Sequence, residues 1–161
     1  MNFGQNWSLT DVVRYDQVDF VGTMMHEVLH SFGWGALTGA NSTRMLYASM
    51  ITDDDGEKVY NRDTTFNSAF DGNLIGKNGG LYFSGANAVK EYGGLVPVFT
   101  PKEFAGGSTV HHLDDDTFTD ENMKMMNAEV PDGVKIWTLS AVELAILKDL
   151  GYNVVPLPED D

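Results

Sequence analysis

The histidines constrain the fold of this chain more than any other residue type. All four lie in two clusters, His26 and His30 within the segment HEVLH and the doublet His111-His112 far downstream. Two histidines four residues apart on a helix project from the same face, so both rings can reach one metal ion. Glu27 then lies beside that ion, where a general base for a metal-bound water would sit. Because histidine occurs nowhere else, the clusters are interpreted as placed for chemistry.

The first cluster lies in a segment whose pattern predicts a helix. Asp19 suits the N-cap, and Gly33 suits the position where the chain leaves a helix in a left-handed conformation. Between them, apolar residues recur at a spacing of three to four. They are Phe20, Val21, Met24, Val28, Leu29 and Phe32. The histidine pair is therefore expected on a buried helix of about four turns.

Composition limits the classes of protein to consider. A length of 161 residues suits one domain, and the absence of cysteine excludes disulfides and thiolate zinc ligands. The formal net charge of −14 argues against nucleic-acid or anionic-membrane partners and favours divalent cations and basic or neutral partners. No apolar run is long enough for a membrane span, and no signal-peptide pattern opens the chain.

The first half of the chain outside that helix predicts short elements. Residues 1–18 are weakly patterned, and the expected anchors against the main body are Trp7, Leu9, Val12 and Val13. Apolar residues over 44–52 and 58–60, joined by the turn Asp53-Asp54-Asp55-Gly56, predict a hairpin. Residues 61–80 are expected to form a long surface loop, and residues 81–83 a short strand.

The second half contains the clearest helix signal. Ser84 is expected to cap a helix over 86–92 that ends at Gly93-Gly94, and an extended piece is expected between Pro97 and Pro101. Residues 106–129 have no regular pattern although they include the histidine doublet. Ser140 and Glu143 form a capping box before an apolar helix that ends at Gly151.

A catalytic zinc needs three protein ligands and an open position. His26, His30 and Gly33 extend the pattern to His-Glu-x-x-His-x-x-Gly, which resembles the metzincin metalloproteases. Most metzincins have their third histidine three residues beyond the glycine, where this chain has Ala36, which cannot bind a metal. The only other candidates are His111 and His112, and a distant third histidine is typical of the leishmanolysin-like branch.

Further motifs support that resemblance, which covers roughly residues 18 to 152. The segment 107–114, GSTVHHLD, is similar to the Ser-x-x-His-(aromatic or Leu)-Asp stretch of bacterial relatives. Met125-Met126-Asn127 resembles the Met-turn beneath the metal, and residues 144–152 resemble the closing helix of the family.

The resemblance implies roles for single residues. His112 becomes the third ligand, with Asp114 orienting it or a neighbouring group. His111 is the alternative ligand, or a hydrogen-bond donor to the tetrahedral intermediate. Met126 is placed under the zinc, with Met125 as its competitor. Some metzincins use a tyrosine after the Met-turn to stabilise the oxyanion, and no tyrosine follows Met126 closely.

The fold implied is α+β, a zincin catalytic domain over residues 1–161. The N-terminal segment and active-site helix span 1–33, and a C-terminal subdomain spans 34–161 with an insertion at 34–107. About 25 residues before His26 are too few for the usual N-terminal sheet, so that subdomain is expected to be reduced or missing. The missing subdomain could then lie in the remainder of a larger parent polypeptide. That remainder is therefore an expected partner of this chain.

The function implied is a secreted zinc endopeptidase that acts on peptides or proteins with Glu27 as base. One alternative is a metal-stabilised surface or binding module that has a metzincin-like scaffold but little peptidase activity. A zinc hydrolase acting on another bond is a third hypothesis. Calcium is a further candidate ligand at Asp53–Asp55 and at Asp114–Asp116, although neither cluster has EF-hand spacing.

Overall fold

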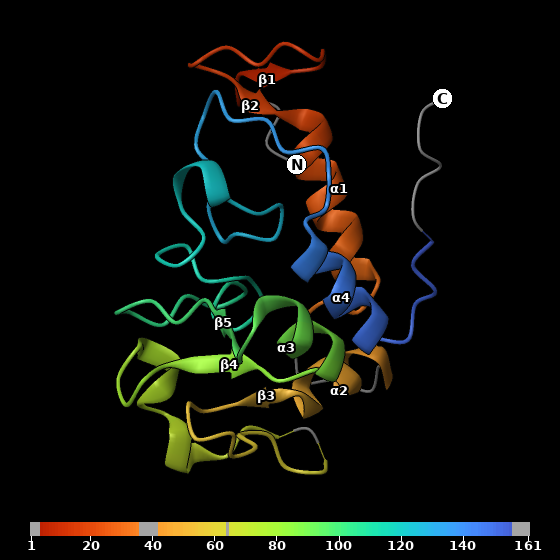
Figure 1. Ribbon diagram of the computed structural model, residues 1–161. Coiled ribbons are helices and arrows are strands. Elements are labelled where there is room, and N and C mark those ends of the chain that lie inside the picture. The colour runs from red at the N-terminus through yellow and green to blue at the C-terminus, as the bar shows by residue number, and fades with distance from the viewer. Residues whose placement is uncertain (1–3, 36–41, 64, 156–161) are drawn as a thin grey trace.

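The protein is a mixture of short helices and strands connected by long irregular segments. The computed structural model describes residues 4–35, 42–63 and 65–155, with residues 42–45 described by their backbone alone. Figure 1 shows helix α1 upright, a two-stranded pair at its N-terminal end, and a three-stranded sheet beyond its C-terminal end. The structure is therefore mixed, with both helices and strands, and is compatible with the predicted α+β class.

Helix α1 (Phe20–Ser31) begins and ends as predicted. The Asp19 side chain accepts the Val21 N–H at 3.2 Å and also accepts the indole N–H of Trp137 at 2.7 Å. Gly33 follows the helix with φ 91°, a left-handed conformation that favours glycine. The expectation of a buried helix is only half met, because Met24, Val28 and Phe32 of the apolar stripe are exposed by 36 to 46%.

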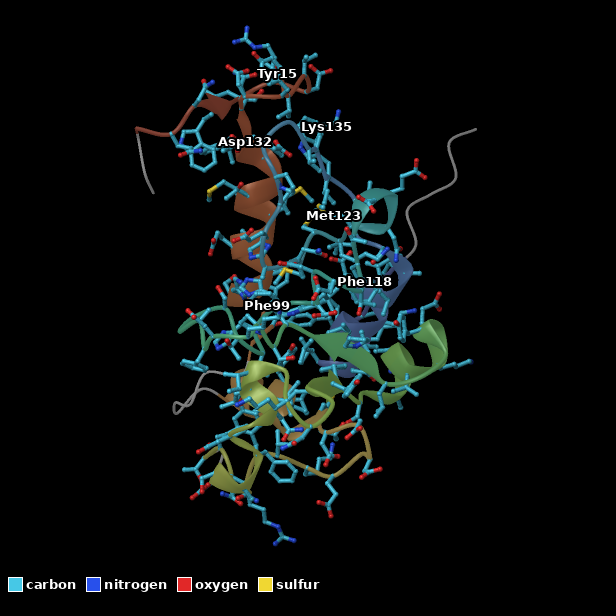
Figure 2. All side chains as sticks on the ribbon, turned by 90° about the vertical axis from the view of Figure 1, so that its left-hand side faces the viewer. Tyr15, Phe99, Phe118, Met123, Asp132 and Lys135 are labelled. Atoms are coloured by element: carbon cyan, nitrogen blue, oxygen red, sulfur yellow. The ribbon has the colours of Figure 1, made fainter. Side chains whose placement is uncertain are left out.

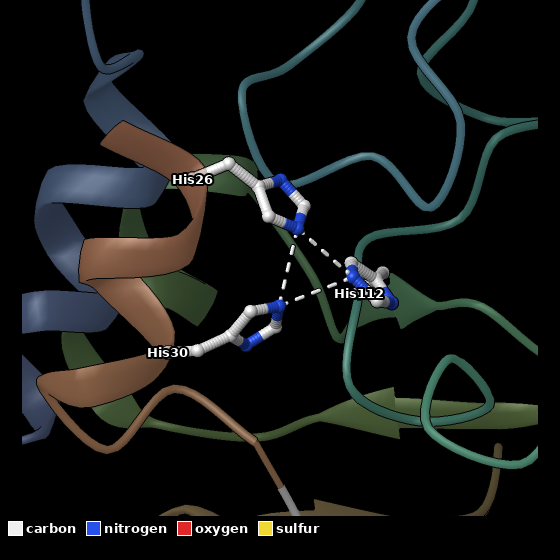
Figure 3. A group of neighbouring side chains, drawn as sticks. All are labelled: His26, His30 and His112. Atoms are coloured by element: carbon white, nitrogen blue, oxygen red, sulfur yellow. Dashed lines mark hydrogen bonds between the residues drawn. The ribbon is translucent and has the colours of Figure 1, made fainter. Parts of the chain in front are cut away.

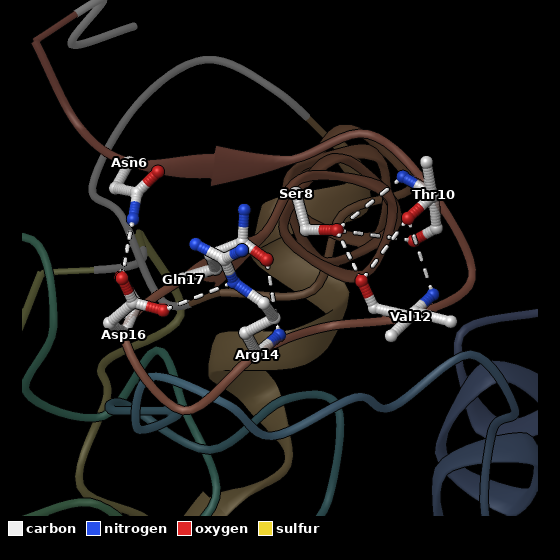
Figure 4. Close-up of polar contacts among 7 residues, drawn as sticks. All are labelled: Asn6, Ser8, Thr10, Val12, Arg14, Asp16 and Gln17. Atoms are coloured by element: carbon white, nitrogen blue, oxygen red, sulfur yellow. Dashed lines mark hydrogen bonds and ion pairs between the residues drawn. The ribbon is translucent and has the colours of Figure 1, made fainter.

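Polar contacts order the N-terminal segment together with one predicted anchor, Trp7, whose ring packs edge-to-face on Phe20 with centroids 5.7 Å apart. Strands β1 (Trp7–Ser8) and β2 (Val18–Asp19) pair in parallel, and the loop between them projects from the end of the molecule where Figure 2 labels Tyr15. The prediction was wrong for Leu9 and Val12, which are 71% and 66% exposed. In Figure 4 the Ser8 hydroxyl donates to the Val12 carbonyl at 2.8 Å. Short-range hydrogen bonds of this kind hold a turn without apolar packing.

A three-stranded antiparallel sheet forms the centre of the core. It has the order β3 (Ile51–Thr52), β4 (Leu81–Phe83) and β5 (Val96–Val98), so the predicted strand at 81–83 is confirmed. The predicted extended piece covers the end of β5, where Pro97 is tolerated because it needs no ladder donor at a sheet edge. Beyond β5, Leu113 bridges Val98 and Asn127 bridges Leu113, which brings the histidine doublet beside the methionine-rich segment.

The predicted hairpin over 44–60 is wrong in its first half. Residues Ser42–Ser49 form helix α2, and only Ile51–Thr52 are a strand, with a single antiparallel bridge from Thr52 to Lys58 around the acidic turn. Tyr47 and Ala48 are buried neighbours on α2, so tertiary packing supports the helix. Leu, Met and Ala are also good helix formers, so their propensity adds to the effect of packing.

Helices α3 (Ala86–Tyr92) and α4 (Ala141–Asp149) lie close to their predicted bounds and pack on each other. The capping box of Ser140 and Glu143 is confirmed. Ser84 does not cap α3, because its hydroxyl donates to the Met50 carbonyl at 2.7 Å. The Asp149 carboxylate of α4 instead accepts the N–H groups of Asn87 and Ala88, both at 2.9 Å.

In their described parts, the predicted loops contain short helical turns and isolated β-bridges. Residues 61–80 include the 3-10 turns Ser68–Phe70 and Asn73–Ile75, and residues 106–129 include Asp120–Asn122. Among the described residues, none of the helices has the length and apolarity needed to cross a bilayer.

Candidate metal centre

Three histidine rings from two distant segments meet at one point. The Nε2 atoms of His26, His30 and His112 lie 3.1, 3.1 and 3.2 Å apart, as the dashed triangle in Figure 3 shows. Two nitrogens on a tetrahedral zinc with bonds of about 2.05 Å lie about 3.3 Å apart. The triangle therefore has the size of one face of a zinc coordination sphere, and these residues could hold one metal ion.

The hydrogen bond made by Nδ1, the ring nitrogen that points away from the triangle, decides whether Nε2 has a free lone pair for a metal. The Nδ1 atoms of His26, His30 and His112 lie 2.7, 2.8 and 3.0 Å from the carbonyl oxygens of Met125, Trp34 and Ser108. A carbonyl only accepts, so each Nδ1 carries the hydrogen and each neutral ring has a lone pair on Nε2.

Three lone pairs at such short distances repel one another unless a cation lies between them. The preference of zinc for imidazole nitrogen, and its need for an open fourth position, match a set of three histidines. Hydrogen bonds from the outer nitrogens to carbonyls are the usual way in which such ligands are oriented. The donor set therefore fits a divalent metal.

Burial keeps two of the three histidines in the neutral form that can bind a metal. Desolvation is the largest influence on His26 and lowers its pKa, although the hydrogen bond to the Met125 carbonyl acts in the opposite direction. Desolvation also lowers the pKa of His112 to about 4. Both rings are therefore unprotonated near neutral pH, which is the state required of a ligand.

The lowered pKa values predict that the metal-free protein loses stability in mild acid. Between the ordinary histidine pKa of 6.5 and about 4, the unfolded chain binds a proton at His112 that the folded protein does not. The free energy of unfolding should therefore fall by about 3 kcal/mol from His112 as the pH drops through this window. Urea denaturation of the metal-free protein at several pH values measures this slope. His112→Ala should have a shallower slope, and an equal slope would contradict the assignment.

The turn that presents His112 holds a residue in an unusual conformation. Val110 has φ 70°, which is a genuine outlier for a β-branched side chain, and its side chain is buried. The N–H of Val110 donates to the Phe99 carbonyl at 2.8 Å, and the Val110 carbonyl accepts the Tyr47 hydroxyl at 3.1 Å. Burial raises the pKa of Tyr47, so this hydroxyl remains a donor. Strain next to a ligand is a common feature of functional sites.

The conformation of Val110 predicts an inverted order of two substitutions. At an ordinary position glycine is less stable than alanine by about 0.4 to 1 kcal/mol. In the left-handed region alanine carries a penalty of about 1 to 2 kcal/mol that glycine lacks. Val110→Gly should therefore be at least as stable as Val110→Ala, because release from the left-handed penalty offsets both the greater backbone entropy of glycine and its loss of the buried Cβ. Chemical denaturation measures the free energy of unfolding of the two variants. A glycine variant that is clearly less stable than the alanine variant would refute the left-handed conformation of Val110.

The structure places His111 outside the triad and Asp114 on Thr117, and a role for His111 as a donor to the tetrahedral intermediate stays a prediction. His111 is buried outside the triad, where a Cβ added to Gly35 would lie 3.2 Å from its Nδ1. Asp114 does not orient His112, because the Nδ1 of that ring meets Ser108, while Asp114 accepts the N–H and hydroxyl of Thr117 at 2.9 and 2.6 Å. Ala36 lies outside the described residues.

The methionine segment reaches the metal centre through its backbone. The Met125 carbonyl accepts the Nδ1–H of His26, and the Met126 side chain is fully buried in the core. Whether Met126 lies under a bound metal stays a prediction. No sequence signal identified the three carbonyls that orient the ligands, because every residue has one.

Glu27 lies beside a pocket next to the metal centre. It is exposed and lines this pocket together with its neighbour His26. The pocket has a volume of about 190 Å³, with walls from the first two turns of α1 and from residues 125–136. The predicted base therefore lies at an accessible edge of the histidine cluster.

The acidic clusters have local structural roles. The carboxylates of Asp53, Asp54 and Asp55 come within 4.8 Å of one another, but Asp53 accepts the N–H groups of Asp55 and Glu57 as an ordinary turn cap. In the second cluster, Asp115 accepts N–H groups of the chain after Asn127. Calcium binding stays a prediction at both places.

Comparisons with known proteins add no further constraint on this site. The chain matches no protein-family model, no curated protein and no solved structure. The geometry of His26, His30 and His112 alone therefore identifies the candidate metal centre.

Proposed function

We propose that this protein is a zinc-dependent endopeptidase. The observation that carries the proposal is the convergence of three Nε2 lone pairs, two of them from a helix that also presents Glu27. An assembly of this kind suits hydrolysis, because a zinc held by three histidines would keep a position for water, and Glu27 lines the pocket beside His26.

The residues have separate roles in the proposed reaction. His26, His30 and His112 would hold the zinc, which supplies a Lewis acid for the scissile carbonyl and makes its water more acidic. Glu27 accepts the proton of the attacking water and later transfers it to the leaving amine. The backbone carbonyls of Met125, Trp34 and Ser108 keep the rings oriented throughout.

The pocket beside Glu27 supports a substrate with a bulky side chain next to the scissile bond. Cavities of about 150 Å³ hold a benzene molecule, so a volume of about 190 Å³ has room for an aromatic or long aliphatic group. Val18, Val130 and Ile136 contribute apolar walls, and Thr23 a polar one. Membership of the metzincin clan is part of the same proposal and is supported by the His-Glu-x-x-His-x-x-Gly pattern with a distant third ligand.

A metal-stabilised binding module is the second candidate. The specific observation in its favour is the apolar face of α1, where Met24, Val28 and Phe32 line an exposed groove beside Leu139. A face of this kind is typical of a surface that contacts another polypeptide. Both candidates bind zinc, so metal content alone does not separate them.

Cleavage of a broad peptide library separates the two candidates. The zinc-loaded protein should cut peptides, the chelator-treated protein should not, and added zinc should restore cutting. Metal analysis should find about one zinc per chain in the active sample. A protein that binds zinc but leaves the whole library intact would support the binding module and overturn the endopeptidase.

A further inference from the structure

Glu143 is a buried carboxylate with more contacts than a helix cap requires. Its side chain is 0% exposed. One oxygen, Oε2, accepts the N–H and hydroxyl of Ser140 at 2.8 and 2.7 Å and so completes the capping box of α4. The other oxygen, Oε1, accepts the N–H of Met126 at 2.9 Å. Burying a charge is costly unless it is fully hydrogen-bonded, and the cap accounts for only one of these two oxygens.

The contact with Met126 leads directly to the metal centre. The Met126 N–H and the Met125 carbonyl are the two ends of one peptide group. That carbonyl accepts the Nδ1–H of His26 at 2.7 Å. A carboxylate at the N–H end of an amide draws the hydrogen toward it and increases the negative charge on the carbonyl oxygen. The hydrogen bond from His26 is strengthened as a result.

A second ligand provides an internal comparison. The Nδ1 of His112 lies 3.0 Å from the Ser108 carbonyl, and the N–H of the same peptide group, that of Thr109, donates to the carbonyl of Ala105 at 2.9 Å. The arrangement is the same as at His26 except that it ends on a neutral carbonyl. The contact made by His26 is the shortest of the three, at 2.7 Å against 2.8 Å for His30 and 3.0 Å for His112, which is the direction expected for a chain that ends on a charge.

We propose that Glu143 is a positioning residue for the metal ligand His26, acting through the Met125–Met126 peptide group. The inference rests on the proposed metal centre and does not require peptidase activity. Many metal-ligating histidines donate directly to a carboxylate, which fixes the ring and makes the other nitrogen more basic. Here a peptide group lies between carboxylate and imidazole and transmits the same effect. Glu143 thereby links the start of α4 to the binding site on α1.

Glu143→Gln is the variant that tests this link. Glutamine still completes a capping box, so its oxygen is expected at the Ser140 side, where two donors meet. Its NH₂ group then faces the Met126 N–H, and that contact is lost because both groups are donors. Asp149→Asn is the matched control, since it neutralises another hydrogen-bonded carboxylate of the same helix that caps α3.

Zinc affinity and histidine resonances are measured on the full chain. Chelator competition should show zinc binding about tenfold weaker in Glu143→Gln, at the lower end of the range for outer-shell partners. The Nδ1–H resonance of His26 should move upfield, with those of His30 and His112 unchanged. The metal-free variant should also show a smaller Nδ1–H tautomer fraction at His26. Asp149→Asn should lose stability without any of these changes, and Glu143→Asp should recover part of the affinity.

The outcomes separate this inference from the proposed function. Affinity within twofold of wild type, with an unmoved His26 resonance, would overturn the role of Glu143, and so would equal effects in Asp149→Asn. Zinc binding without peptide cleavage contradicts only the proposed endopeptidase activity. If zinc does not bind at all, the tautomer fraction of His26 in the metal-free protein still decides the role of Glu143. Should Glu143→Gln not fold, the wild-type spectrum decides. His26 Nδ1–H must then resonate downfield of the His112 signal, and the reverse order refutes the proposal.

Discussion

Replacing Glu27 by alanine should abolish peptide hydrolysis while the protein still binds about one zinc per chain. Glu27 is exposed and is not among the metal-binding histidines, so its loss leaves the three Nε2 donors in place. Removing a general base costs about 10²- to 10⁴-fold in rate. The measurement is the initial rate of cleavage of the best library peptide, together with metal content of the same sample.

The control for this prediction is another exposed glutamate. Glu91 lies on α3, away from the pocket beside His26, and Glu91→Gln should retain both zinc and activity. Cleavage by Glu27→Ala at more than a tenth of the wild-type rate would refute the role of Glu27. Loss of zinc from this variant would instead assign the carboxylate to the metal site.

The second large effect concerns the histidine doublet. His112→Ala should eliminate tight zinc binding, because it removes the only ligand that comes from outside α1 in the observed triad. His111→Ala should keep the metal, since the ring of His111 lies against Gly35 and not in the triad. The two variants remove the same side chain from adjacent positions, so each serves as the control for the other.

Thermal unfolding provides the readout for the doublet. A ligand at about 100 times its Kd stabilises the folded state by about 2.7 kcal/mol, so zinc should raise the Tm of wild type and of His111→Ala. The Tm of His112→Ala should not respond to zinc. A zinc-dependent rise in His112→Ala, or its absence in His111→Ala, would reverse the assignment of the third ligand.

These expectations show how much of the site was predictable from the chain. His26, His30 and Glu27 follow from spacing on a helix that Asp19 and Gly33 delimit, because caps and periodicity are local properties. His112 was predicted only through a resemblance and by the lack of other histidines. The structure supports the choice by bringing its Nε2 to the other two.

The misassigned elements are those in which local signals compete. The segment 42–49 combines Tyr47, which favours a strand, with Leu46 and Ala48, which favour a helix, and the packing of Tyr47 and Ala48 selects a helix. Leu9 and Val12 were expected to anchor the N-terminal segment, but hydrogen bonds within the turn hold it and leave both side chains exposed. Propensity alone does not reveal which interaction dominates.

The sequence by itself determined the parts of this protein that depend on near neighbours. These are α1 with its histidine pair and the capping box of α4. Only the tertiary structure decided which backbone carbonyls orient the rings, that Val110 is left-handed and that Glu143 contacts Met126. The reason is physical. Backbone groups are the same at every residue, so long-range packing alone selects which of them meet a given side chain.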